Sequence, residues 1–221
     1  VMCLVLFSYN KTPGYRLVLA ANRDEFFARP TAPLHWWTDN NKILAGRDMQ
    51  DEGTWLGVSP NGNFGGLTNY RELPVVGKSF ISRGEIVTDF ISRSSDPLSF
   101  LEKLQKRSSY YRGFNVLLGN VSSLWYYSNR GDGFLEVPSG IHGLSNHLLN
   151  SSWPKVERGK MLFSEVLQEK TFNPDSIFEI LHDSSRPDES ELPDTGIGRE
   201  WEKKLGPIFI TSDIYGTRSS A

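Results

Sequence analysis

One thiol and one dense polar group are the residues best suited to chemistry. Cys3 is the single cysteine of the 221 residues, and it follows Met2 at the start of an apolar run. The sequence Asn-Arg-Asp-Glu at 22–25 closes a second apolar run. A thiol becomes a strong nucleophile only as the thiolate, which needs a base or a nearby positive charge. The pattern predicts a nucleophilic site in which Cys3 is activated by Arg23 or by a main-chain amine.

The position of Cys3 suggests where that amine comes from. Removal of the residues before Cys3 would free its α-amine, whose unperturbed pKa of about 7.7–8.0 suits a general base at neutral pH. While Val1 and Met2 remain, that nitrogen is an amide and cannot accept the proton. A lone cysteine in an apolar strand is more often an inert core residue. The placement of Cys3 favours the nucleophile over that interpretation.

Two asparagines and two histidines extend the list of candidates. Asn69 and Asn146 each stand where an apolar run ends, and side-chain amides there can donate to a developing oxyanion. An asparagine that closes a turn is an equally good interpretation of each. His142 and His147 flank Asn146. A Cys–His dyad is one interpretation of them, and loop histidines are the other.

Composition excludes several functions. A net charge of −2 gives no electrostatic basis for binding nucleic acid or an anionic membrane. One cysteine excludes an internal disulfide framework and a cysteine-based metal cluster, and no HExxH motif is present, so no metal is expected. The longest apolar runs are strand-sized, which predicts no transmembrane segment, and the N-terminus lacks the basic region of a signal peptide. We expect a cytoplasmic, enzyme-sized protein.

The strands are predicted from apolar runs and turn signals. Runs 2–9 and 15–22 predict a central hairpin around the Pro-Gly turn at 10–14, covered on both faces because both runs are almost continuously apolar. The segment 28–33 predicts an extended connector, since two prolines interrupt it. Further strands are predicted at 42–46, 54–58, 63–70, 114–118, 123–128, 134–137, 141–146, 209–212 and from 215.

Four helices are predicted from capping signals and spacing. A capping box at 82–85 opens the first and Asp96 with Pro97 opens the second, and these two are expected to lie together on one face of the sheet. The third runs from 153 to 169 with Val156 on its apolar stripe, and the fourth runs from 174 to 182 with Asn173 as its cap. A polar loop is expected at 184–198. The order of strands and helices predicts an α+β fold in which helices cover both sides of antiparallel sheets.

The motifs also carry a resemblance. The chain resembles the NRDE-motif family, that of transport and Golgi organisation protein 2, through these segments in order: 2–3, 20–30, 53–57 (Gly-Thr-Trp-Leu-Gly), 67–70 (Leu-Thr-Asn-Tyr), 143–146 (Gly-Leu-Ser-Asn) and 215–218 (Tyr-Gly-Thr-Arg). The resemblance spans 1–221 as a single domain. In that family the chain continues past the last motif, so the resemblance implies that further C-terminal strands are missing from this sequence.

The family is distantly similar to N-terminal-nucleophile hydrolases of the choloylglycine hydrolase and penicillin V acylase type. That similarity implies a four-layer αββα sandwich of antiparallel sheets. It matches Cys3 to the nucleophile, Asp24 to the aspartate that contacts the α-amine, Asn69 and Asn146 to the asparagines near the oxyanion, and Arg218 to a late arginine.

One position departs from those enzymes. They carry an arginine three residues before the aspartate, where this chain has Ala21, and its arginine is Arg23. Substrate orientation and thiol activation therefore do not transfer directly. The resemblance leaves four residues as candidates for substrate binding: Asn22, Arg23, Trp55 and Tyr70.

Two hypotheses follow from the resemblance. The first is an N-terminal cysteine amidohydrolase or acyltransferase that acts on a small amide or thioester without a cofactor. The second is a non-catalytic binding or trafficking protein for a lipid-like ligand or haem, with mitochondrial or Golgi association. For haem, Cys3, His142 and His147 are the candidate axial ligands.

Overall fold

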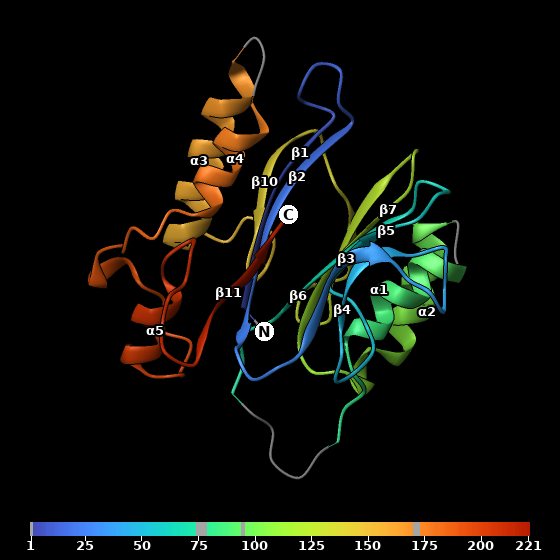
Figure 1. The fold of residues 1–221 in the computed structure, drawn as a ribbon, viewed down its shortest axis with the longest axis horizontal. Coiled ribbons are helices and arrows are strands. Elements are labelled where there is room, and N and C mark those ends of the chain that lie inside the picture. Colours follow the sequence, from blue (N-terminus) through green and yellow to red (C-terminus); the bar gives the residue numbers. More distant parts are fainter. Residues whose placement is uncertain (1, 74–78, 94–95, 170–172) are drawn as a thin grey trace. The chain divides into compact units, whose positions relative to one another are not determined.

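The chain divides into two compact units, which are described separately. The computed structural model describes residues 2–73, 79–93, 96–169 and 173–221 (Figure 1). The first unit comprises 1–28, 71–74 and 138–221, and the second comprises 29–70 and 75–137.

The first unit contains a four-stranded antiparallel sheet. Its strand order is β10 (Gly140–Leu144), β1 (Met2–Tyr9), β2 (Leu17–Phe26) and β11 (Tyr215–Ser220). The predicted hairpin β1–β2 is confirmed as the centre of this sheet, with Cys3 opposite Arg23. Leu4, Leu6 and Ala20 project from one face into the hydrophobic core that the helices complete.

Three helices belong to the first unit. They are α3 (Pro154–Gln168), α4 (Pro174–Leu181) and α5 (Arg199–Leu205). Val156 and Phe163 of α3 pack in the same core as Leu6, and Gly159 lets α3 approach closely because a Cβ there would lie 2.9 Å from the Leu6 side chain. Asn173 caps α4 as predicted, accepting from the Asp175 N–H at 3.0 Å. In Figure 1 the paired α3 and α4 run along one face of this sheet.

The second unit contains a seven-stranded antiparallel sheet. In spatial order its strands are β3 (Thr31–Trp36), β4 (Leu44–Asp48), β5 (Leu56–Val58), β6 (Phe64–Asn69), β7 (Phe114–Gly119), β8 (Leu124–Ser128) and β9 (Phe134–Glu136). The helices α1 (Gly84–Arg93) and α2 (Pro97–Arg107) pack together against it, as predicted (Figure 1). Asp96 caps α2 by accepting from the Ser99 N–H at 2.9 Å.

Four predictions about local structure were wrong. The segment predicted as a connector forms the edge strand β3, where Pro33 is tolerated because one side of an edge strand needs no ladder bonds. The capping box does not close, because Glu85 bonds the Tyr111 hydroxyl and the Ser82 hydroxyl donates to Asp51. Residues 209–212 form no strand, and α5 was missed because charged residues dominate its seven positions.

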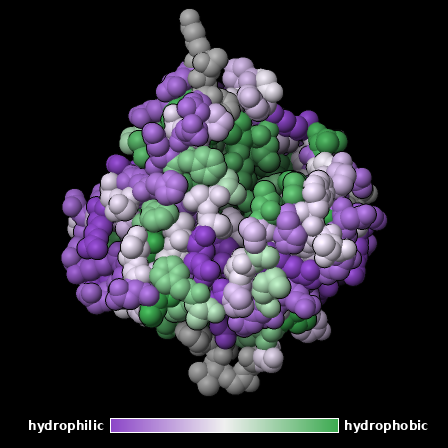
Figure 2. Space-filling model, in the orientation of Figure 1, coloured by the Kyte–Doolittle hydropathy of each residue, from purple (hydrophilic) through white to green (hydrophobic). Residues whose placement is uncertain are grey.

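The surface is mixed in hydropathy. Figure 2 shows hydrophilic and hydrophobic residues interspersed over the displayed face. No helix among the described residues has the length and apolar content to cross a membrane.

A close backbone contact in the second unit yields a stability prediction. A Cβ on Gly53 would lie 2.6 Å from the carbonyl carbon of Gly84, whereas a Cβ on Gly84 would lie 3.2 Å from Gly53. We expect Gly53→Ala to lower the free energy of unfolding by about 1–3 kcal/mol, because backbone must move to admit the methyl group. Gly84→Ala should cost less, since alanine also favours the helix that begins there. Urea unfolding measures both, and equal losses would contradict the geometry.

Candidate active site

Cys3 lies within the central hairpin and is fully buried. Its carbonyl accepts the Ser145 hydroxyl at 2.9 Å. Burial, helped by the negative charge of Asp24, raises the pKa of the Cys3 thiol to about 12, although Arg23 and the backbone N–H of Asp24 oppose the shift. With Val1 and Met2 in place, the thiol is therefore protonated at neutral pH.

The sequence had suggested that the polar group at 22–25 stands at the end of the second strand. The structure places it inside β2 instead. Successive side chains of a strand point to opposite faces. Asn22 and Asp24 therefore face the helices, and Arg23 and Glu25 face away from them. Arg23 and Glu25 form an ion pair at 3.7 Å with both side chains buried. Cys3, the cross-strand partner of Arg23, shares the second face.

Asp24 lies beside the main chain that precedes Cys3. It is the cross-strand partner of Met2, so it is adjacent to the peptide bond whose cleavage would free the Cys3 amine. The Thr217 hydroxyl of β11 donates to Asp24 Oδ1 at 2.7 Å. Burial raises the pKa of Asp24 to about 6, and the positive charge of Lys155 is the largest influence in the other direction.

Lys155 is a site residue that sequence reasoning missed. It is the second residue of α3, is 3% exposed, and faces Asp24. Within the described part of the chain, neither its Nζ nor Asp24 Oδ2 has a hydrogen-bond partner. Burial lowers the pKa of Lys155 to about 8, and Asp24 opposes that shift. The available signal was a lysine in the first turn of a helix whose neighbouring Val156 was expected in the core.

Asn146 follows the end of β10. The ladder between β10 and β1 ends at the pair of Leu144 and Val5, two residues before Asn146. Ser145, which precedes Asn146, donates its hydroxyl to the Cys3 carbonyl, so the two segments are in contact here. Asn146 is fully buried, and its carbonyl accepts the Arg71 N–H at 2.7 Å.

Arg218 and Asn22 lie on elements next to these residues. The Arg218 guanidinium donates to the carbonyls of Phe26 and Phe27 at 3.1 and 2.9 Å, at the end of β2. Asn22 Nδ2 donates to the carbonyls of Leu181 and Ile208 at 2.7 and 3.0 Å, so it holds the helical layer to the sheet.

The other predicted site residues belong to the second unit. Asn69 ends β6 and is buried. The N–H of Tyr70 donates to the Gly113 carbonyl at 2.9 Å, and the Trp55 carbonyl accepts the Leu67 N–H at 2.7 Å. The roles of these three residues stay predictions from the resemblance.

The described residues give haem and metals little to bind. Both ring nitrogens of His142 are engaged, Nε2 with the Pro138 carbonyl at 2.9 Å and Nδ1 with Asn150 at 3.0 Å. Neither ring nitrogen of His142 is therefore free to bind a haem iron. Cys3 is fully buried. No group of three or more His, Cys, Asp or Glu that could hold a metal occurs in the described ranges.

The fold belongs to a known class. The structure is similar to that of the Caenorhabditis elegans N-acylethanolamine-hydrolyzing acid amidase ortholog, with a TM-score of 0.54 at 8% sequence identity, over 84% of this chain and 87% of that one. The expected fold class, that of the N-terminal-nucleophile hydrolases, is confirmed.

The sequence matches define the family within that class. The family model for Transport and Golgi organisation 2 matches residues 2–221. The Transport and Golgi organization protein 2 homologs of Bos taurus and Homo sapiens are each 37% identical, over 240 and 241 residues, covering 99% of this chain and 87% of each relative. The chain belongs to the Transport and Golgi organisation 2 family.

The bonds of Asn22 predict a graded loss of stability. Its Oδ1 accepts the Ser220 hydroxyl at 2.7 Å in addition to the two bonds that its Nδ2 donates. Asn22→Ala should lower the free energy of unfolding by about 2–4 kcal/mol, because it leaves buried carbonyls without donors. Ser220→Ala removes one bond and should cost about 1 kcal/mol. Calorimetry compares the two, and an Asn22→Ala protein as stable as Ser220→Ala would contradict this role.

Proposed function

We propose that this protein is an N-terminal cysteine amidohydrolase or acyltransferase that acts on a small amide or thioester. The observation that carries the proposal is the register around Cys3. Asp24 adjoins the peptide bond before Cys3, and Ser145, which precedes Asn146, donates to the Cys3 carbonyl at 2.9 Å. Cleavage of that bond would free an amine on the residue that carries the thiol, next to the Asp24 carboxylate of the neighbouring strand.

The proposed reaction proceeds through an acyl-enzyme. Cys3 Sγ attacks the substrate carbonyl carbon while the thiol proton passes to the freed α-amine. Asn146 donates to the resulting oxyanion. The α-ammonium then protonates the departing amine or thiol, which leaves a thioester on Cys3. Water or an acceptor nucleophile attacks this thioester, loses its proton to the α-amine, and releases the acyl product and the Cys3 thiol.

Electrostatics support the need for the free amine. The Cys3 thiol is fully buried, and burial raises its pKa to about 12. Arg23 favours the thiolate, but its ion pair with Glu25 places a negative charge next to it. A base within reach of the sulfur therefore has to remove the proton at neutral pH, and an α-amine freed on Cys3 itself would be such a base. The fold likeness to an amidase supports amide chemistry as the substrate class.

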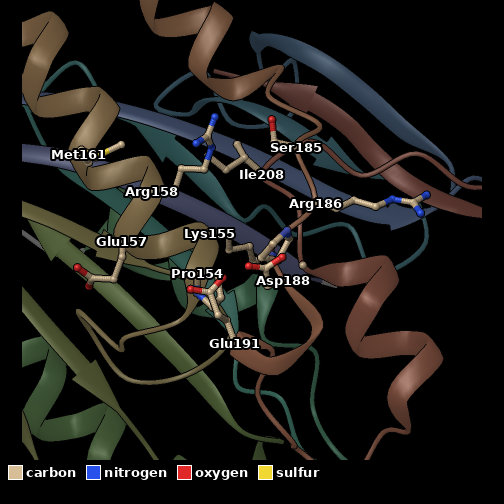
Figure 3. Close-up of a pocket in the computed structure, with 12 residues that line it drawn as sticks. Pro154, Lys155, Glu157, Arg158, Met161, Ser185, Arg186, Asp188, Glu191 and Ile208 are labelled. Atoms are coloured by element: carbon tan, nitrogen blue, oxygen red, sulfur yellow. The ribbon is translucent and has the colours of Figure 1, made fainter.

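The binding hypothesis has weaker support in the first unit. One of its pockets, of about 410 Å³, has a charged lining that includes Lys155, Arg158 and Arg186 together with Glu157, Asp188 and Glu191 (Figure 3). Such a wall does not match an apolar lipid chain, since buried charges require polar partners. The hydrolase proposal is therefore preferred.

The reactivity of Cys3 tests the proposal. A chain with Cys3 first, released from a cleavable leader, should react with iodoacetamide at pH 7.5 at least about ten times faster than N-acetylcysteine, which has no free amine beside its thiol, because an adjacent amine generates the thiolate. The chain that keeps Val1 and Met2 should react at least about ten times more slowly than free cysteine, and its rate should rise with pH, because its thiol pKa is about 12.

The chain offers a clean background for this measurement, because Cys3 is its single cysteine. Cys3→Ala should show no labelling in either form. A second readout is the mass of the N-terminal peptide after exposure to a p-nitrophenyl ester, which should reveal an acyl group on Cys3 in the processed chain. Equal labelling rates for the two forms would refute the proposed function.

A further inference from the structure

We infer that Lys155 is a positioning residue for the proposed reaction, whose ammonium holds the Asp24 carboxylate charged and oriented to receive the α-ammonium of Cys3. The inference rests on the proposed function. It assigns a role to a lysine of the helical layer that no motif of the chain includes.

The first argument is the pattern of hydrogen bonds around Asp24. Oδ1 is held by the Thr217 hydroxyl at 2.7 Å, which fixes the orientation of the carboxylate. Oδ2 and Lys155 Nζ are both buried without a hydrogen-bond partner in the described part of the chain. Two opposite buried charges that each lack a bond cost stability. In the chain that begins at Cys3, the α-ammonium of Cys3 would supply the hydrogen-bond donor that Asp24 Oδ2 lacks.

The second argument concerns the other charges that face Lys155. Arg71 and Glu202 of α5 lie near it, and so do Asp24 and Cys3. Arg71 and Glu202 form an ion pair with each other, and the Arg71 guanidinium stacks 4.3 Å from the Trp153 ring centre.

Glu202 is also committed to its own loop. Its Oε1 accepts both the N–H and the hydroxyl of Thr195, at 2.9 and 2.6 Å. Because Glu202 already has these partners, Asp24 is the carboxylate that the Lys155 ammonium stabilises. The groups that favour the charged form of Asp24 in turn are Lys155, the Thr217 hydroxyl and, from the other face of β2, Arg23.

The third argument is the placement of Lys155 on its helix. In Figure 3 Lys155 and Glu157 leave the first turn of α3 in different directions. Glu157 is bonded by Lys160 at 3.2 Å on the exposed side. Lys155 is 3% exposed, although a flexible lysine can usually carry its charge to solvent. Pro154 fixes the start of the helix, so Lys155 is held over the sheet rather than free to leave it.

The test uses the chain that begins at Cys3. Lys155→Met keeps the length of the side chain without its charge, Lys155→Arg keeps a charge, and Lys160→Met is the matched control on the same helix. The first readout is the pH midpoint of the Asp24 carboxyl ¹³C resonance. The second is the pH profile of Cys3 alkylation.

Loss of the ammonium should move both readouts. Lys155→Met should raise the Asp24 midpoint by about one pH unit or more, because an opposite charge favours the carboxylate, and should slow alkylation at pH 7 about tenfold. Lys155→Arg should bring the Asp24 midpoint and the alkylation rate most of the way back to those of the unsubstituted chain. Lys160→Met should change neither value. Lys155→Gln serves if Lys155→Met does not fold, as judged by circular dichroism.

Two results would overturn the inference. One is an Asp24 midpoint that stays the same in Lys155→Met. The other is a shifted midpoint with an unchanged alkylation profile in a reactive chain, since that would make the pair structural. Failure of the proposed function is recognised separately, because an unreactive thiol in the unsubstituted processed chain refutes it while the Asp24 midpoint still reports on Lys155.

Discussion

The register between β1 and β2 determines which way every polar group of the site points. Leu4, Leu6 and Ala20 must face the helical core of the first unit, and side chains of a strand alternate between its faces. Cys3 then faces away from the helices and Asp24 faces toward them. A slip of one residue would reverse this arrangement and expose the apolar set, so the hydrophobic core itself holds the site in place.

The same register explains why charged groups are buried in the first unit. Once β2 passes through the middle of the sheet, its Asn-Arg-Asp-Glu sequence is carried into the interior. Each polar member then needs a specific neighbour. Arg23 has Glu25, Asn22 bonds the carbonyls at the ends of the helical layer, and Asp24 has Thr217 and the charge of Lys155. Such an arrangement lowers stability relative to an apolar core, which is typical of functional sites.

Sequence patterns sufficed for the elements with local signals. Apolar runs and the turn at 10–14 predicted the central hairpin, and Asp96 and Asn173 predicted the starts of two helices. Such patterns did not predict the structure of segments whose conformation depends on tertiary contacts. Pro33 concealed the edge strand β3, because a proline excludes only some of the ladder positions.

The site shows the same division. Cys3 and Asp24 were identified from position and resemblance, and the structure shows how the register relates them. Lys155 had no motif, because its importance comes from Asp24, which is 131 positions earlier in the chain. Charge pairs between distant segments leave little trace in a single sequence.

The proposed function depends most on whether the natural protein carries a free amine on Cys3. Mass measurement of the N-terminal peptide from the protein isolated from its own cells answers this directly. We predict a peptide that begins with unmodified Cys3. A peptide that retains Met2, with or without an acetyl group, would contradict the account, because the nucleophile would then have no base of its own.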